Sequence, residues 1–502
     1  MKKIIILGGG TAGWLTALLI KQNWSTCDVT VIEDPSKPPI IAGESGSFAM
    51  NDIMNHLNIN FFDWIKEVNA MPKLGGKFYD WYELGSVFTH GAIDSKVRFD
   101  VIKADCFKAL ADSGIDEELC LVKGIPFHKL YAGGYLIDQN KVPFLKEDPS
   151  GKTITHFTSM YHFDSRANAN YLKKLGIQRG VNLLEKKYVK STIDGDAGII
   201  RGLVFDDATG IDGDWFFDCS GFARLLLDKV MHVEYEDHSK LFPASSVFAW
   251  WDEKPICKSY TEATAMKYGW SWNINIANRA GNGYIYDGTE INLDQAIDEA
   301  RVRFNKKIEP VASFSFNPCN AKEYWKGNVI GVGLSTGFVE PLESNGLGLV
   351  AIGLQQLLMK WNPESDFNGK EQKMYNDKLY TSSNEMIDFL NLHYRGNRTD
   401  TSYWMKLKEK ETMSKGVQNL LECYREGMIP KELQIIYSQQ SYYTVMQALN
   451  LLNIDKMKSR LSHYSPEISK QHNEFLKIVE HIYTTDVGRC HDIEDWKNGF
   501  HG

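Results

Sequence analysis

The chain begins with apolar runs and a helical stripe that together predict a β-α-β unit. Residues 4–7 are all apolar, and residues 8–10 are glycines. Apolar residues then recur at helical spacing at Ala12, Leu15, Leu18 and Leu19, and residues 29–32 form a second apolar run. Short apolar runs are typical of buried parallel strands, and apolar residues that recur every three or four positions are typical of a helix. We therefore expect a strand, a tight turn, a helix and a second strand.

The remaining chain divides into mixed, strand-rich and helical stretches. Residues 75–215 give short strand and turn signals with one helix near residues 164–175. Further strands are predicted at residues 199–205, 215–218 and 328–334. Residues 245–316 alternate apolar and polar positions, which predicts a β-sheet layer. Beyond residue 347 the pattern is helical, with dense leucine, methionine and aromatic residues.

Gly8, Gly10 and Gly13 have the G-x-G-x-x-G spacing of a nucleotide-binding turn. In such a turn the first glycine permits the tight bend, the second the approach of a phosphate and the third close packing of helix on strand. The helix N-terminus then faces a pyrophosphate. Glu33 follows the second apolar run, about 20 residues after the last glycine, where a carboxylate accepts from a ribose hydroxyl. This favours FAD or NAD over NADP; a strand–turn–helix without ligand is the alternative.

These patterns predict an α/β fold class with two regions. Residues 1–360 are predicted to form an FAD-binding Rossmann-type module with a nested β-sheet layer on the substrate side. Residues 361–502 are predicted to form a mainly α-helical C-terminal region that closes the substrate pocket. The predicted strand at 215–218 ends in Asp-Cys-Ser-Gly, a sequence that we expect to return to the same nucleotide.

Composition and charge argue against several classes of function. A net charge of −8 and an isoelectric point near 5.9 disfavour a nucleic-acid or anionic-membrane partner. No apolar run reaches about 18 residues, and the N-terminus leads directly into a strand. We therefore expect no membrane span, no signal peptide and a cytoplasmic location. The eight cysteines form no C-x-x-C pair, and no residues have metal-ligand spacing, so reduced thiols and no metal are expected.

Residues 328–346 join a predicted strand to a predicted helix through a polar turn. The turn contains Glu343, Ser344, Asn345 and Gly346, and the helical stripe begins at Leu347. One interpretation is structural: Ser344 or Asn345 caps the helix, and Glu343 complements its dipole. The other is that free N–H groups near Asn345 and Gly346 bind an anion or the edge of a flavin ring.

A series of motifs runs in one order through most of the chain. They are GGGTAGW at 8–14, HFD at 162–164, DCSGF at 218–222, GWSW at 269–272, GNGYIY at 281–286, FVEPLES at 338–344 and RTDT at 398–401. Together they resemble the flavin-dependent halogenases, especially the tryptophan-halogenase group. The resemblance implies an enzyme that takes reduced FAD from a separate flavin reductase. Oxygen and halide then give hypohalous acid, which passes through a tunnel to an aromatic substrate.

The resemblance also implies catalytic roles for single residues. Lys73 corresponds to the lysine that presents hypohalous acid to the substrate, either as an ammonium or as a haloamine, and Lys77 is its structural neighbour. Glu343 corresponds to the carboxylate that stabilises the arenium intermediate and accepts its proton. Ser344 corresponds to the residue beside the tunnel.

The resemblance implies binding positions for cofactor and halide as well. Asn345 and Gly346 correspond to the halide-binding backbone positions, with Asn345 in place of the usual threonine. The expected cofactor contacts are Gly8, Gly10, Thr11, Ala12, Gly13, Glu33, Gly333 and Gly346. The halide is chloride, bromide or iodide, with a weak bias toward the two that are easier to oxidise.

The substrate end departs from the family pattern. Trp270 and Trp272 correspond to an aromatic wall that keeps substrate from flavin, and they are equally typical of a packed β face. Ala92 stands where the tryptophan halogenases have a stacking ring. The segment between residues 427–430 (GMIP) and 441–443 (SYY), which helps form a lid in those enzymes, is much shorter here. His90 and Tyr437 are candidates for the pocket, with structural roles as the alternative. We expect a wider pocket that accepts phenols, indoles and other electron-rich aromatics.

Other functions on the same fold stay open. A flavin-dependent monooxygenase is the main alternative, and it would need no lysine beside the ring. A non-catalytic FAD- or NAD-binding protein is the second alternative. A substrate bound to a carrier protein and a homodimeric assembly are also open.

Overall fold

The computed structural model describes residues 1–37, 44–93, 96–148, 150–152, 159–195, 198–253, 255–367, 369–428 and 436–501. The chain divides into two compact units, each assembled from three stretches. The first unit comprises Met1–Ala70, His162–Ser246 and Ala312–Asn384, and the second comprises Met71–Tyr161, Val247–Val311 and Glu385–Gly502. The two-region division at residue 360 stays a prediction. No helix of the described residues is long and apolar enough to cross a membrane.

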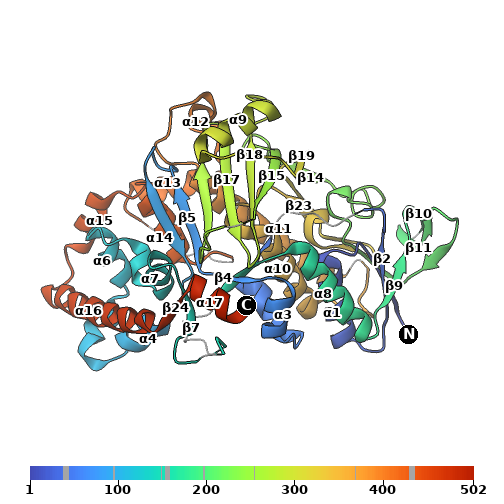
Figure 1. Cartoon of the computed structure of the whole chain (residues 1–502), viewed down its shortest axis with the longest axis horizontal. Helices are drawn as coiled ribbons and strands as arrows, with labels where there is room; N and C mark the ends of the chain where they lie inside the picture. Colours follow the sequence, from blue (N-terminus) through green and yellow to red (C-terminus); the bar gives the residue numbers. More distant parts are fainter. Residues whose placement is uncertain are drawn as a thin grey trace. The chain divides into compact units, whose positions relative to one another are not determined.

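A six-stranded, mostly parallel sheet organises the first unit, in the order β21-β22-β13-β1-β2-β9. Two of its strands, β2 and β9, are labelled in Figure 1. Its strands are β1 (Lys3–Leu7), β2 (Asp28–Glu33), β9 (Asn182–Glu185), β13 (Trp215–Asp218), β21 (Trp325–Lys326) and β22 (Val329–Gly331). The predicted strands at residues 4–7, 29–32 and 215–218 are confirmed, and β1 pairs in parallel with both neighbours. The strand predicted at 328–334 is shorter, because Gly333–Thr336 form a 3-10 turn.

Buried helices pack beside this sheet. The helices of the first unit are α1 (Thr11–Asn23), α2 (Phe48–His56), α3 (Phe61–Glu67), α8 (Ser165–Gln178), α10 (Asn345–Lys360) and the first part of α11 (Lys370–His393). The predicted helix near residues 164–175 is confirmed as α8. A Cβ atom added to Gly176 of α8 would lie 2.8 Å from the indole ring of Trp14, so this glycine lets α1 and α8 approach closely.

Smaller strand groups complete the first unit. The antiparallel strands are β10 (Tyr188–Asp194), β11 (Ile199–Phe205) and β12 (Gly210–Asp212), then β14 (Tyr235–Asp237), β20 (Cys319–Ala321) and β23 (Gly337–Phe338), and finally β3 (Glu44–Ser45) with β8 (Met160–Phe163). The strand predicted at 199–205 is confirmed as β11. The edge strand β19 (Ala312–Ser315) is exposed throughout.

A largely antiparallel sheet organises the second unit, with strands in the order β15-β18-β17-β16-β5-β6. These strands are β5 (Gly75–Tyr79), β6 (Val87–Gly91), β15 (Ser246–Asp252), β16 (Thr261–Ala265), β17 (Gly269–Asn275) and β18 (Ala280–Tyr286). The β-sheet layer predicted for 245–316 is therefore present. It is interrupted by helix α9 (Leu293–Phe304), which was not predicted although Asn292 and Gln295 form a capping box at its start.

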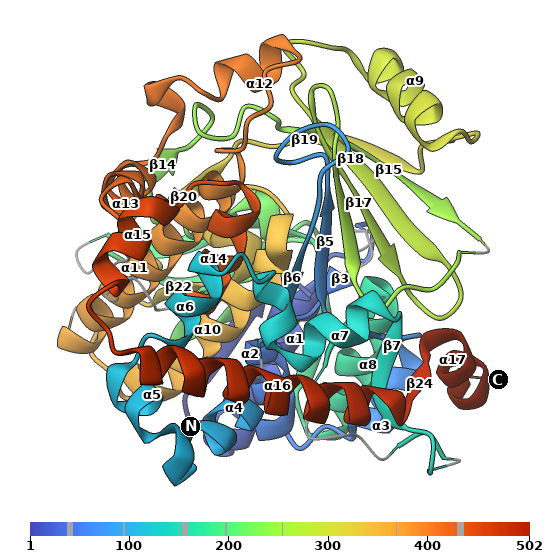
Figure 2. The same cartoon turned by 90° about the vertical axis from the view of Figure 1, so that its left-hand side faces the viewer.

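Four short helices of the second unit pack on one long helix, α16 (Pro466–Gly488), as Figure 2 shows. They are α4 (Lys96–Ile102), α5 (Lys108–Ser113), α6 (Asp116–Val122) and α7 (Ala132–Asp138). The second unit also contains helices α12 (Ser402–Lys406), α13 (Lys415–Arg425), α14 (Gln439–Ala448), α15 (Ile454–Leu461) and α17 (Ile493–His501). Its short strands are β4 (Met71–Lys73), β7 (Lys141–Leu145) and β24 (Cys490–Asp492). The expectation of one helix in residues 75–215 is wrong, because α4 to α7 also lie there. Each has only six or seven residues, too few for a helical period to show, and each is stabilised by packing on α16.

A buried histidine lies within this helical cluster. His472 of α16 is completely buried, and the Lys123 ammonium donates to its Nδ1 at 2.7 Å. Because an ammonium only donates, the ring proton belongs on Nε2, which lies 3.3 Å from the Cys120 sulfur. Burial, and after it the Lys123 and Arg98 cations, lower the pKa of His472 to about 3. The folded protein therefore keeps His472 neutral in mild acid.

This histidine is expected to make the protein less stable as the pH falls. Between the ordinary pKa of 6.5 and the folded pKa of about 3, the unfolded chain binds a proton that the folded chain does not. The free energy of unfolding should therefore fall by about 2 kcal/mol between pH 7 and pH 5 through this group. Urea unfolding at both pH values should show a smaller fall for His472→Gln, whereas His481→Gln, which changes an exposed histidine of the same helix, should match the wild type. If the free energy of unfolding fell equally in the wild type, His472→Gln and His481→Gln, the lowered pKa of His472 would be contradicted.

Candidate active site

The three motif glycines of the turn between β1 and α1 have different roles. Gly8 has φ +124°, and a Cβ atom there would lie 2.2 Å from the Cys219 carbonyl oxygen. A Cβ on Gly13 would lie 1.9 Å from the Gly8 oxygen. Gly10, at the N-cap of α1, has no atom within 4 Å of such a Cβ. Gly8 and Gly13 are therefore required by packing, whereas Gly10 opens onto free space.

The start of α1 fits a pyrophosphate. No side chain caps this helix, and its first turn contains no acidic residue. The first N–H groups of an uncapped helix, next to the open space above Gly10, form a binding site for phosphate oxygens. Glu33 lies at the end of β2, where its Oε2 would be 2.6 Å from a Cβ on Gly9. The residues present thus fit an adenine dinucleotide, with the pyrophosphate at α1 and a ribose beside Glu33.

The Asp-Cys-Ser-Gly segment returns to this glycine turn, and its contact with the nucleotide stays a prediction. The Cys219 amide donates to the Leu7 carbonyl at 2.9 Å, next to Gly8. The completely buried Asp218 accepts the amides of Leu226 and Leu227, each at 2.8 Å, and those hydrogen bonds shape the loop that follows β13. Asp218 therefore has a structural role in placing Cys219.

A second glycine turn joins the nucleotide region to helix α10. Gly333 has φ +78°, and a Cβ there would lie 3.1 Å from the Ala12 Cβ and 3.4 Å from a methyl group of Val350. The predicted residues Ala12 of α1 and Gly333 are thus neighbours, and Val350 of α10 packs beside them. Gly346, in the first turn of α10, would have no atom within 4 Å of an added Cβ and so borders open space.

Glu343 and Ser344 have an unusual backbone immediately before α10. Their φ values are +59° and +60°, so two successive non-glycine residues are in the left-handed region. Ser344 is the N-cap residue of α10, as the structural interpretation expected, but its side chain makes no capping hydrogen bond. The Asn345 amide group donates back to the Leu342 carbonyl. Such a conformation costs about 1–3 kcal/mol per residue and is typical of functional sites.

Replacing Ser344 by glycine is expected to stabilise the fold. Glycine adopts positive φ without steric cost, so the free energy of unfolding should rise by about 1 kcal/mol. Urea unfolding measures this change. Ser438→Gly is the control, because Ser438 is an N-cap with φ −67° and should show no gain. Loss of stability in Ser344→Gly would show that the strain is not relieved by glycine.

In the second unit, Lys73 lies on strand β4 and is only 4% exposed. The next residue, Leu74, donates its amide to the Ser259 carbonyl at 2.7 Å and accepts the Ala92 amide at 2.5 Å. A Cβ on Gly75 would lie 2.3 Å from the His90 carbonyl oxygen. Three predicted residues, Lys73, His90 and Ala92, are therefore brought together by the pairing of β5 with β6. Lys77 lies farther along β5, with its ammonium 5.5 Å from the centre of the Tyr260 ring.

An aromatic cluster surrounds the buried Phe389 near this point. His90 and Tyr437 both contact its ring, at centroid distances of 5.8 Å and 3.8 Å, and Tyr437 is stacked on it. Glu385 accepts the Tyr437 amide at 3.2 Å and so fixes the segment before α14. Tyr442 also contacts the Phe389 ring, at 5.0 Å, and both Tyr442 and its neighbour Tyr443 are core residues, with 4% and 2% exposure.

Trp270 and Trp272 lie on one face of β17, with ring centroids 5.9 Å apart. The Trp272 indole covers Gly283 of β18, where a Cβ would lie 2.1 Å from the ring. Trp270 also contacts Trp81, at 6.2 Å. The packed β face is therefore confirmed, and the GNG motif is explained by the indole that it accommodates.

The predicted site residues are thus distributed over both units. The first unit contains Gly8, Gly10, Thr11, Ala12, Gly13, Glu33, Gly333, Glu343, Ser344, Asn345 and Gly346. The second unit contains Lys73, His90, Ala92, Trp270, Trp272 and Tyr437.

Comparison with known proteins identifies the family. The family model for tryptophan halogenase matches residues 3–463. The chain belongs to the tryptophan halogenase family. It is 28% identical to the tryptophan 7-halogenase of Lentzea aerocolonigenes, over 95% of this chain and 94% of that one. It is 29% identical to the tryptophan 6-halogenase of Streptomyces toxytricini, over 84% of this chain and 82% of that one.

Solved structures of flavin-dependent halogenases share the fold of this family member. The enzyme from Xanthomonas campestris superposes with a TM-score of 0.82 at 23% identity, over 98% of this chain and 97% of that chain. The one from Brevundimonas sp. BAL3 has a TM-score of 0.81 at 23% identity, over 100% and 99% of the two chains. The predicted mixed α/β fold class is confirmed.

Several residues near the family's motifs were not found from the sequence. Asn168 of α8 is completely buried, accepts from the Trp64 indole at 2.8 Å and donates to the Thr11 hydroxyl at 3.2 Å. Phe389, the centre of the aromatic cluster, was not singled out either. Each lies far along the chain from its partners, and no local signal marks it. Among the described residues, no group of three histidine, cysteine or acidic side chains could hold a metal ion.

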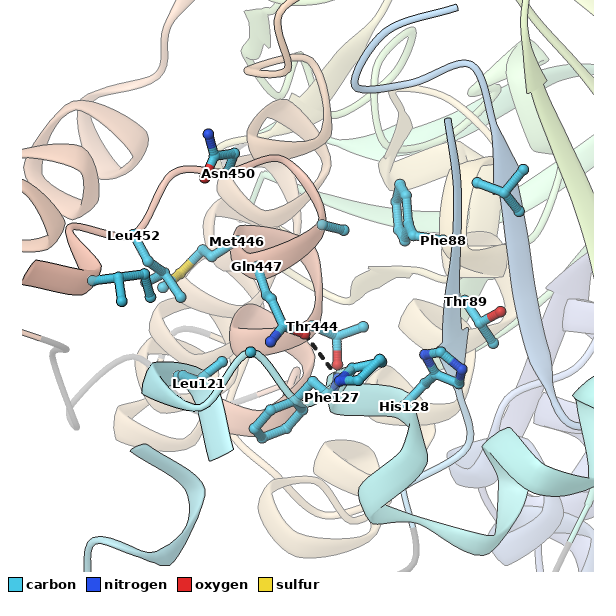
Figure 3. A pocket seen from close by; sticks show the side chains of 15 residues that line it. Phe88, Thr89, Leu121, Phe127, His128, Thr444, Met446, Gln447, Asn450 and Leu452 are labelled. Atoms are coloured by element: carbon cyan, nitrogen blue, oxygen red, sulfur yellow. Dashed lines mark hydrogen bonds between the residues drawn. The ribbon is translucent and has the colours of Figure 1, made fainter. Parts of the chain in front are cut away.

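A separate cavity of about 330 Å³ lies in the second unit of this halogenase-family chain (Figure 3). Val87, Phe88 and Thr89 of β6 form one wall, and the C-terminal half of α14 forms another. Gln447 projects toward it, but its amide donates to the Ile125 carbonyl and accepts the Phe127 amide, both at 2.8 Å. None of the predicted site residues, all of which the structure describes, lines this cavity.

Proposed function

We propose that this member of the tryptophan halogenase family uses FADH2, oxygen and halide to halogenate electron-rich aromatic substrates that are not limited to free tryptophan. The observation that supports this most is the burial of Lys73, which is 4% exposed and lies two residues before β5, the partner strand of β6. Lysine is almost never fully buried unless it is paired. The small side chain of Ala92 supports the wider substrate range.

The bound reduced flavin supplies the two electrons by which oxygen and halide give hypohalous acid and water. The N–H groups at the start of α1 bind the pyrophosphate, and Glu33 accepts from the ribose. The N–H groups near Asn345 and Gly346 bind the halide. These assignments use the uncapped helix starts and the open space at Gly10 and Gly346.

In the proposed halogenation, the Lys73 ammonium donates a hydrogen bond to the oxygen of hypohalous acid and makes the halogen more electrophilic. The aromatic carbon forms a bond to halogen as the O–X bond breaks, and the oxygen takes a proton from the Lys73 ammonium and leaves as water. Glu343 accepts the ring proton, which restores the aromatic system. Overall, FADH2, oxygen, the arene, halide and one proton give FAD, the aryl halide and two molecules of water.

We propose that reduced flavin is delivered by a separate flavin reductase. The test is to reduce FAD anaerobically with the purified protein and then admit air in the presence of chloride, bromide or iodide. Phenols, indoles and free tryptophan are offered separately and analysed by mass spectrometry. Halogenated phenols or indoles are expected. Oxygenated products would favour a flavin-dependent monooxygenase, and turnover of tryptophan far above every other arene would contradict the wider range.

A further inference from the structure

Lys173 lies between two carboxylates at the edge of the nucleotide region. Its Nζ is 3.1 Å from Glu33 Oε2 and 3.3 Å from Glu185 Oε1. Glu33 and Glu185 end the neighbouring parallel strands β2 and β9 and are register partners. Lys173 comes from helix α8, so three separate elements of the first unit meet at this point.

The Lys173 ammonium provides a positive charge between the two carboxylates. Two carboxylates at the ends of adjacent strands repel each other, and a cation between them removes that repulsion. Ion pairing with both glutamates raises the pKa of Lys173 against the opposing effect of partial burial, so the side chain is charged at neutral pH. Meanwhile the Glu33 carboxylate lies against the Gly9 backbone, immediately before the open space at Gly10.

We propose that Lys173 is a positioning residue for the adenosine half of FAD; this rests on the proposed use of FAD. Lys173 contacts one oxygen of Glu33 and keeps the carboxylate directed along the glycine turn. The other oxygen remains for the ribose hydroxyls, which donate to it. The lysine does not touch the reacting part of the flavin.

The proposal predicts a change in affinity that depends on the adenosine half. Lys173→Met should weaken binding of oxidised FAD and of ADP about fivefold, the effect expected for losing a partly exposed ion pair. Binding of FMN, which lacks adenosine, should not change. Lys173→Arg should restore FAD affinity, and Lys174→Met, which changes the exposed neighbour, should match the wild type. Flavin fluorescence titration and calorimetry with ADP measure these affinities.

A second variant tests the role of repulsion. In Lys173→Met, replacing Glu185 by glutamine removes the charge that opposes Glu33, so Lys173→Met/Glu185→Gln should recover part of the lost FAD affinity. Unchanged FAD affinity in Lys173→Met, or an equal loss for FMN and FAD, would overturn the positioning role. Failure of the wild type itself to bind FAD would instead contradict the proposed function.

Discussion

Replacing Lys73 by methionine is expected to lower the rate of halogenation about a thousandfold while FAD binding is retained. The lysine is buried on β4 in the second unit, and methionine fills similar space without leaving a buried charge. The glycine turn and Glu33 belong to the first unit, so the variant leaves the residues of the nucleotide region unchanged. Single-turnover reactions with reduced FAD, bromide and an indole, followed by mass spectrometry, measure the rate.

Lys77→Met is the matched control for this experiment. Lys77 is part of the same segment but points its ammonium toward the Tyr260 ring, and its loss should change the rate less than twofold, roughly the effect of a weak cation–π contact. Lys73→Arg distinguishes the two possible roles of this lysine, a hydrogen-bond donor to hypohalous acid and the amine of a haloamine. Arginine donates hydrogen bonds but does not serve as the amine of a haloamine. Halogenation at an unchanged rate in Lys73→Met would refute the role of Lys73.

Substitutions of Gly13 and Gly10 to alanine are expected to separate folding from cofactor binding. Gly13→Ala places a Cβ 1.9 Å from the Gly8 oxygen, a contact between backbones that no rotamer relieves. It should lower the free energy of unfolding by about 3 kcal/mol or more and abolish FAD binding with it. Thermal melting and FAD titration measure the two effects.

Gly10→Ala is expected to behave in the opposite way. Its φ is −80°, and nothing lies within 4 Å of the added Cβ, so melting should match the wild type. The methyl group would enter the space where the pyrophosphate is expected, so FAD affinity should fall at least about tenfold. Normal FAD binding in Gly10→Ala would place the pyrophosphate elsewhere.

The strands of the N-terminal β-α-β start were predicted to within one residue because their signals are local. The apolar runs of β1 and β2, the helical stripe of α1 and the glycine spacing each lie within one element. Helices α4 to α7 escaped prediction because they have fewer than two turns, and most of their stability comes from packing on α16, which lies more than 300 residues farther along the chain. The capping box at Asn292 was a local signal for α9 that alternation in the flanking strands obscured.

The candidate site likewise contains some residues that the local sequence predicts and others that it does not. The glycines and Glu33 follow from the spacing of a known turn, whereas Lys73 and Glu343 were assigned only through resemblance to a family. Nothing in the sequence indicated that Glu343 and Ser344 adopt positive φ, since neither residue type favours it. Asn168 and Lys173 are polar residues on a predicted helix, and the sequence alone did not reveal which side chains they meet.

By itself, the sequence determined the β-α-β start, the glycine turn, the candidate carboxylate at its edge and the family. These features depend on residue type and spacing over short distances, where backbone sterics and burial act directly. The tertiary structure alone decided that Lys173 lies between Glu33 and Glu185, that Asn168 contacts Thr11 and that Tyr437 stacks on Phe389. Such contacts join residues far apart in the chain, and they form only when the packing of whole elements brings those residues together.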